Sequence, residues 1–168
     1  MKPEASDSEG TFLLEEFLPY ELSIAANRTS RMFARRYSEA FGISIAEWRV
    51  MAVVGRFGSI SPGTVSDRTE MDKVKVSRAA SGLIGAGLLE QLADPADGRA
   101  RRLQLTAAGH AMHRAIVPLA RTLEAQLAAG LSAEEWAVLR ICLRKLDSHL
   151  RRLDLAEPDG HLPETPEP

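Results

Sequence analysis

The sequence predicts a mainly helical α+β fold, and three observations support this. Hydrophobic residues make up 45% of the 168 residues but aromatic residues only 5%, which favours helices packed through aliphatic side chains over a sandwich or barrel. Apolar residues recur at helical spacing over most of the chain. The stretch 88–105 instead places two short segments on either side of Asp94-Pro-Ala-Asp-Gly-Arg99, which is typical of a β-hairpin.

The first two helices have recognisable ends. Apolar positions from residue 11 to about 41 predict one long helix, and Pro19 must break or kink its start because proline has no backbone N–H to donate. Gly42 is a suitable helix stop. Ser44 can then cap a second helix that ends at Phe57.

Two shorter helices follow. Ser61-Pro62 combines an N-cap with proline at the first helical position, and it predicts a short helix to about Glu70. Asp72 can cap the next helix, which Gly87 ends. On a helical projection, one face of this helix is apolar and the opposite face carries small and basic side chains. The apolar face is expected to pack and the basic face to stay free.

Charge is unevenly distributed along the chain. The net charge is −2, which is unusual for a protein that binds nucleic acid, so the position of the basic residues matters. Residues 73–102 carry a net charge of +3 and the remainder −5. The six basic residues of this stretch are Lys73, Lys75, Arg78, Arg99, Arg101 and Arg102.

The elements of residues 45–105 occur in the order of a winged helix-turn-helix. A helix fits the major groove of DNA, and an arginine near a hairpin tip can enter the narrower minor groove. We therefore predict that residues 45–105 form a DNA-binding lobe. The alternative is a small module with a solvated charged face, which would serve protein–protein assembly without a ligand switch.

The last two helices carry the features of an association surface. Thr106 can cap a long helix that tolerates Pro118 only with a kink and ends at Gly130. Residues 132–135 have the sequence of a capping box. The final helix has a narrow seam with alternating spacings of three and four, which we interpret as a dimer interface rather than intramolecular core. The seam comprises Trp136, Leu139, Leu143, Leu146, Leu150 and Leu153.

The hairpin sequence resembles that of a known family. Residues 94–109 are similar to the wing signature of the MarR family of bacterial transcription regulators, Asp-x-Arg followed by Leu-Thr-x-x-Gly. Residues 72–78 and 83–88 resemble the recognition helix of that family and its exit. The resemblance covers roughly residues 11–155.

The resemblance implies a homodimer that binds double-stranded DNA. Helical regions 11–41 and 106–155 would interlock in the dimer, and the lobes 45–105 would straddle a pseudopalindromic operator. By matching position, Asp97 would orient Arg99 through an ion pair while Arg99 enters the minor groove. The DNA-contacting residues so predicted are Lys73, Lys75, Ser77, Arg78, Arg99 and Arg101.

The sequence departs from the family pattern at two places. Gly82 stands where many members carry a long basic side chain, which affects the expected base contacts. Ser66 and Thr69 weaken the apolar face of the helix before the recognition helix.

Regulators of this family often respond to small aromatic ligands, and the chain has residues suited to bind one. Four polar or aromatic residues of the first helix can share a face, and two more open the second helix. An arginine could bind a carboxylate while Trp48 stacks on a ring. Residues 18–27 and 47–50 resemble a branch that responds to aromatic acids or their coenzyme A thioesters. The predicted ligand-binding residues are Tyr20, Ser23, Asn27, Arg31, Trp48 and Arg49.

The ligand site has an alternative interpretation. Trp48 can instead belong to the core, and the arginines can be solvated or contact phosphate. The sequence leaves both interpretations open. In either case the expected function is a repressor, released from its operator by the ligand if one binds.

Several other function classes have little support. There is no nucleophile elbow, phosphate-cradling glycine loop or His-Glu-x-x-His motif, so we predict neither an enzyme nor a cofactor. A small-molecule enzyme using His110 is the weakest alternative. His110 and His113 lack the further ligands of a metal site.

The predicted location is the cytoplasm. The lone Cys142 cannot form an internal disulfide, and the sequence has no signal peptide or membrane span. Residues 1–10 and 156–168 are polar, acidic or rich in proline, and we predict disordered tails there.

Overall fold

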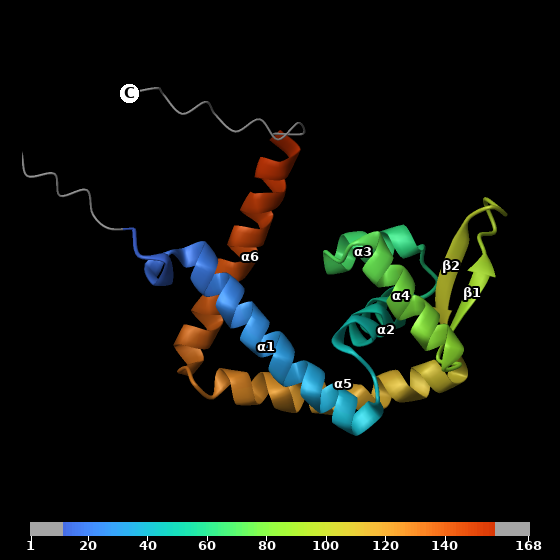
Figure 1. Cartoon of the computed structure of the whole chain (residues 1–168), viewed down its shortest axis with the longest axis horizontal. Coiled ribbons are helices and arrows are strands. Elements are labelled where there is room, and N and C mark those ends of the chain that lie inside the picture. The colour runs from blue at the N-terminus through green and yellow to red at the C-terminus, as the bar shows by residue number, and fades with distance from the viewer. Residues whose placement is uncertain (1–11, 157–168) are drawn as a thin grey trace, which may run out of the picture. The chain divides into compact units, whose positions relative to one another are not determined.

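The computed structural model describes residues 12–156, and Figure 1 shows helices with a single β-hairpin. The predicted mainly helical α+β fold is confirmed. The elements are a 3-10 turn η1 (Leu14–Glu16), α1 (Leu18–Phe41), α2 (Ile45–Phe57), α3 (Pro62–Thr69), α4 (Lys73–Gly85), β1 (Leu89–Ala93), β2 (Arg101–Leu105), α5 (Ala107–Ala128) and α6 (Ala133–Ala156). The described chain forms two compact units that divide between Ala120 and Arg121.

The predicted disordered tails fall almost entirely outside the described residues. Ala156 is the exception, because it is the last residue of α6. The long first helix is also shorter than predicted. It begins at Leu18 rather than at residue 11, and Pro19 lies in its first turn. Proline is tolerated there because the first N–H groups of a helix have no carbonyl partner within the helix.

Side-chain caps fix the starts of α2, α3 and α4. Ser44 Oγ accepts a hydrogen bond from Glu47 N (3.2 Å), and the Glu47 carboxylate accepts one from Ser44 N (2.7 Å), which makes a complete capping box. Ser61 Oγ accepts from Thr64 N (3.0 Å). Asp72 Oδ1 accepts from Lys75 N (2.7 Å). The three caps thus fix the residue at which each helix begins.

Most of the buried side chains lie in residues 45–105, the winged lobe, and Tyr37, Ile116 and Leu123 are buried outside it. Within the lobe, α2, α3, α4 and the two strands each bury one face, as expected for short amphipathic elements. On α4 the buried face is Val76, Ala79, Ala80 and Leu83, whereas Ile84, which the helical projection would bury, is 39% exposed. Across the lobe, the fully buried side chains include Val50, Met51, Val54, Val65, Val76, Leu83, Leu89 and Leu103.

The hairpin pairs β1 and β2 antiparallel, with Leu89 opposite Leu105 and Ala93 opposite Arg101. A third segment joins it. Ile60 N donates to Leu103 O (3.1 Å) and Leu103 N donates to Ile60 O (2.7 Å). This bridge attaches the hairpin to the loop between α2 and α3.

The Leu-Thr-x-x-Gly part of the wing signature connects three elements. Gly87 ends the α4 region with a left-handed φ of 70°, which a glycine adopts at little cost. Thr106 Oγ1 donates to Gly87 O (2.7 Å) and accepts from Gly109 N (3.0 Å). A Cβ atom at Gly109 would overlap the carbonyl oxygen of Leu88. Glycine is therefore required where α5 begins against the exit of α4.

The second unit contains the end of α5 and all of α6. Its predicted capping box is confirmed, since Ser132 N donates to Glu135 Oε2 (2.8 Å) and Glu135 N donates to Ser132 Oγ (3.2 Å). An ion pair of 3.3 Å between Arg140 and Glu124 links the two helices. Most of the leucine seam is exposed, including Leu139, Leu143, Leu150 and Leu153. Within residues 12–156, none of the helices has the length and apolarity of a membrane-spanning segment.

Candidate DNA-binding surface

The free face of α4 carries the residues predicted to contact DNA. Lys73, Lys75, Ser77 and Arg78 are all exposed, while the opposite face of the helix is buried in the lobe. Packing on one side holds the helix in place, so its other side presents these groups to solvent. The amphipathic pattern predicted from the sequence is thus present in the structure.

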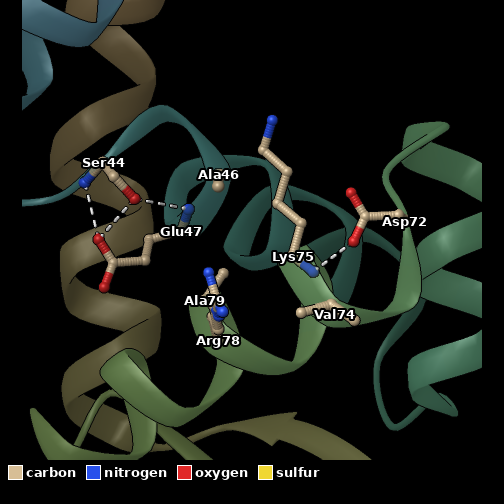
Figure 2. A pocket seen from close by; sticks show the side chains of 8 residues that line it. All are labelled: Ser44, Ala46, Glu47, Asp72, Val74, Lys75, Arg78 and Ala79. Atoms are coloured by element: carbon tan, nitrogen blue, oxygen red, sulfur yellow. Dashed lines mark hydrogen bonds between the residues drawn. The ribbon is translucent and has the colours of Figure 1, made fainter.

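Lys75 and Arg78 line a hollow of about 580 Å³ between α4 and the start of α2. Figure 2 shows these side chains with Ser44, the N-cap of α2, and Glu47 in its first turn. Asp72 lies at the end of the hollow where α4 begins. The hollow therefore combines two cations with two carboxylates.

The two carboxylates of the hollow are occupied by backbone groups. Glu47 caps α2 and Asp72 caps α4, and a carboxylate at a helix N-terminus is stabilised by the free N–H groups there. Within the described part of the chain, none of the predicted DNA-contacting cations forms an ion pair. These cations are Lys73, Lys75, Arg78, Arg99 and Arg101. Their charge is available to an external anion.

The tip of the hairpin is a hydrogen-bonded turn. Asp94 N donates to Ala100 O (3.0 Å), and Ala100 N donates to Asp97 O (2.9 Å). Asp94 Oδ1 accepts from Ala96 N (2.8 Å), and Asp97 Oδ1 accepts from Arg99 N (3.0 Å). The side chain of Arg99 is exposed on this turn. A defined backbone thus carries an exposed arginine.

The predicted ion pair between Asp97 and Arg99 is wrong. Asp97 accepts from the backbone of Arg99, and the ion pair of the hairpin instead joins Asp94 to Arg102 (3.0 Å). Short side chains such as Asp bond readily to the backbone two residues ahead, which removes the carboxylate from the arginine head group. Hydrogen bonds from Ala96 N and from Arg102 lower the pKa of the Asp94 carboxyl.

Arg102 is a residue that the sequence analysis counted only as charge. Its Nε donates to Ser59 Oγ (3.1 Å), its Nη2 donates to Ser59 O, and its Nη1 contacts Asp94. Strand alternation places it on the face opposite Leu103. The alternation was visible in the sequence, but Ser59 lies far along the chain and no local pattern points to it.

The departures from the family pattern have structural explanations. Ser66 Oγ donates to Met71 O (2.5 Å) and Thr69 Oγ1 donates to Val65 O (2.7 Å), so both hydroxyls bond to the backbone around the turn between α3 and α4. A Cβ atom at Gly82 would lie 2.5 Å from Glu47 Oε1. The missing side chain lets α4 approach the capped start of α2.

Comparison with known proteins relates this lobe to one family. Residues 41–100 match the model of the MarR family. A MarR/EmrR family transcriptional regulator from Acinetobacter sp. ADP1 is 25% identical, with a TM-score of 0.77 over 84% of this chain and 99% of that one. Residues 41–100 are thus similar to the MarR family, and the structural similarity extends over most of the chain.

Two further proteins show a similar likeness. The transcriptional regulator PapX of Escherichia coli is 20% identical over 145 residues, which is 85% of this chain and 88% of PapX. The structure of Bordetella bronchiseptica BpsR, described for the regulation of its DNA binding by 6-hydroxynicotinic acid, is 25% identical with a TM-score of 0.76. The similarity covers 82% of this chain and 98% of the BpsR chain.

The predicted ligand residues form two groups. Tyr20, Ser23, Asn27 and Arg31 follow one exposed face of α1. Trp48 and Arg49 lie in α2, where Arg49 is exposed and Trp48 is half-buried. None of the six lines the hollow beside α4.

Trp48 is one member of a row of aromatic rings. Its ring stacks on His113 of α5 (centroids 5.5 Å apart) and meets Tyr37 of α1 (5.6 Å), which in turn contacts Phe33 edge-on (5.9 Å). On α2, a Cβ atom at Gly55 would lie 3.0 Å from the His113 ring. The row therefore joins three helices around Trp48.

Burial changes the acidity of this row. It raises the pKa of the Tyr37 phenol above its ordinary value of 10.0. It also lowers the pKa of His113, and the neighbouring His110 and Arg114 add to that effect. Among the described residues no group of His, Cys, Asp and Glu has the arrangement of a metal site.

Proposed function

We propose that this protein is a homodimeric, sequence-specific DNA-binding transcriptional regulator of the cytoplasm. The observation that carries the proposal is the set of exposed, unpaired cations on α4 and the hairpin tip, held by a lobe with the MarR-family fold. Exposed cations without intramolecular partners release counterions when they meet phosphate, which favours DNA binding. The net charge of −2 is compatible with this, because residues 73–102 carry a net charge of +3 and the negative charge lies in the rest of the chain.

In the proposed complex α4 enters the major groove. Lys73 and Lys75 would contact phosphate, while Ser77 and Arg78 would reach base edges, since arginine binds guanine through two parallel hydrogen bonds. Arg99 at the hairpin tip would enter the minor groove, where the negative potential is strong, and Arg101 would lie along the backbone beside it.

The proposed dimer uses the apolar surface of the second unit. Leu143 and Leu150 are 45% and 49% exposed, and a soluble protein rarely leaves such a row of leucines uncovered. A second copy offers the same seam, which suits a symmetric interface. Two lobes would then place their α4 helices about 34 Å apart on a pseudopalindromic operator.

We propose that the regulator is a repressor released by a small aromatic ligand. BpsR, whose DNA binding is regulated by an aromatic acid, supports this by its similarity over most of the chain. The ligand would lie among the exposed α1 residues and Arg49, with Trp48 and its ring contacts at one end. To release DNA, it must bind the two lobe arrangements with different affinities.

The DNA arm can be tested with duplexes that the full-length protein selects from a random-sequence pool. Arg78→Ala should weaken binding of the selected duplex about tenfold or more and relax the preference at one base step. Arg99→Ala should weaken it more evenly across sequences. Arg36→Ala, at an exposed pair with Glu39 on α1, is the control and should bind as the wild type does.

The outcome decides between DNA binding and the alternatives. Salt-sensitive binding that both variants weaken supports the proposal. Failure to select any duplex, or equal binding by wild type and both variants, would overturn it and favour a protein–protein module.

The ligand arm has a separate test. A panel of aromatic acids and their coenzyme A thioesters should contain a compound that raises the midpoint of thermal unfolding and releases the selected duplex. Arg31→Ala should reduce both effects, because a carboxylate would lose its guanidinium partner. A panel in which no compound does both would overturn ligand release while leaving DNA binding intact.

A further inference from the structure

We propose that Arg102 is a positioning residue that sets the direction of the hairpin tip and thereby the reach of Arg99 into DNA. The inference rests on the proposed function, in which Arg99 contacts the minor groove. Arg102 itself lies in β2, before the tip, and its guanidinium contacts Ser59 and Asp94.

Apolar packing fixes only the base of the hairpin. Leu89, Leu103 and Leu105 are buried there, but the rest of β1 is exposed. A two-stranded hairpin is marginally stable by itself. The outer half, which begins at the pair of Leu92 with Arg102, therefore needs another constraint.

Arg102 supplies a constraint at that point. The backbone bridge between Ile60 and Leu103 is the last main-chain link of the hairpin to the α2–α3 loop. Arg102 extends the attachment by one residue toward the tip, because its Nε and Nη2 both donate to Ser59, the residue next to Ile60. Two donors on one residue fix the plane of the guanidinium.

The attachment continues to Arg99 through hydrogen bonds. Arg102 Nη1 contacts Asp94 Oδ2 (3.0 Å), and Asp94 Oδ1 holds Ala96 N (2.8 Å) at the start of the turn. Asp97 then holds Arg99 N (3.0 Å). A run of polar contacts thus connects the lobe loop to the backbone of the exposed arginine.

Only arginine provides this set of contacts. Its guanidinium has several donors in a rigid plane, whereas a lysine ammonium is a single point at the end of a flexible chain. Arg102→Lys keeps the positive charge near DNA and removes the simultaneous contacts to Ser59 and Asp94. The substitution therefore separates positioning from charge.

A double-mutant cycle tests the proposal. The probes are the duplex selected by the wild-type protein and two versions of it whose flanks, where the hairpin tips would lie, are A·T-rich or G·C-rich. Arg102→Lys should weaken binding of the A·T-flanked duplex about as much as Arg99→Ala does, roughly tenfold, and reduce the preference over the G·C-flanked one. In the Arg99→Ala background it should change affinity by less than about twofold.

Two controls keep the result interpretable. Arg36→Lys makes the same exchange at an exposed ion pair on α1 and should match the wild type. Asp94→Asn removes the charge of the other partner while keeping an oxygen for Ala96 N, and it should show the same coupling to Arg99. It serves as the test if Arg102→Lys unfolds at the assay temperature.

The named outcomes separate this inference from the proposed function. Wild-type affinity in Arg102→Lys, or an equal loss with and without Arg99, would overturn the positioning role alone. A wild-type protein that selects no duplex would overturn the proposed function and this inference with it. Loss that depends on Arg99 supports both.

Discussion

The side chains of the winged lobe and those of α6 differ in the partners they have within one chain. In the lobe, polar groups bond to distant segments, as Arg102 does to Ser59 and Thr106 to Gly87, and Leu83 and Leu103 are each 1% exposed. In α6, Arg152 bonds to Ser148 one turn away, and Leu143 and Leu150 remain about half exposed. The lobe is stabilised by its own contacts, whereas the apolar face of α6 is left exposed within one chain.

The largest expected effect is a loss of stability from a substitution at Gly109, where α5 packs against the exit of α4. Gly109→Ala would force a methyl group against the carbonyl oxygen of Leu88, and the unfolding free energy should fall by about 3 kcal/mol. Urea unfolding at fixed protein concentration measures this. Gly98→Ala is the matched control, because nothing lies within 4 Å of a Cβ there. Equal midpoints for the two variants would contradict the account of the Leu-Thr-x-x-Gly signature.

The next effect concerns the apolar face of α6. Leu150→Asp should raise the dimer dissociation constant about 100-fold or more, because each copy would bury a carboxylate without a partner. Sedimentation across a range of concentrations measures the constant. Ser148→Asp adds the same charge to the opposite side of the helix and should leave the constant nearly unchanged. If the wild type is monomeric at all concentrations, the proposed dimer is wrong.

The capping boxes allow the same substitution in both regions. Ser44→Ala and Ser132→Ala should each reduce stability by about 1 kcal/mol, because each leaves an N–H of the first turn without its hydroxyl acceptor. Thermal unfolding measures both losses. We expect the loss at Ser132 to depend on protein concentration and the loss at Ser44 not to, and the reverse pattern would contradict the comparison.

The smallest expected effect is a pH dependence of the aromatic row. The pKa of His113 is below its ordinary value of 6.5, so the unfolded chain takes up this proton more readily than the folded one. Stability should therefore fall as the pH decreases below about 6.5, toward the lowered pKa, and be unaffected above it. Urea midpoints between about pH 8 and pH 5 measure the slope.

A matched pair of variants assigns that slope. His113→Gln should remove part of it, while His149→Gln at an exposed position of α6 should retain it. Identical slopes in both variants would show that other groups dominate the acid sensitivity.

The sequence determined the order of the elements and most of their ends. Gly42, Ser44, Asp72 and Gly87 act locally, through caps and a left-handed turn, so their signals are readable without the rest of the fold. Pro19 marks the start of α1 at Leu18, but the sequence left open whether it would break the helix or kink it. The basic face of α4 was predictable from helical periodicity alone.

Only the tertiary structure decided which partners the polar and aromatic groups found. The ion pair of the hairpin joins Asp94 to Arg102 rather than Asp97 to Arg99, and Trp48 stacks on His113 from a helix much further along the chain. Such choices depend on distances between segments that are remote in sequence, which periodicity and capping rules do not specify. Local geometry is encoded residue by residue, whereas the pairing of Arg102 with Ser59 exists only once the core has brought the hairpin against its loop.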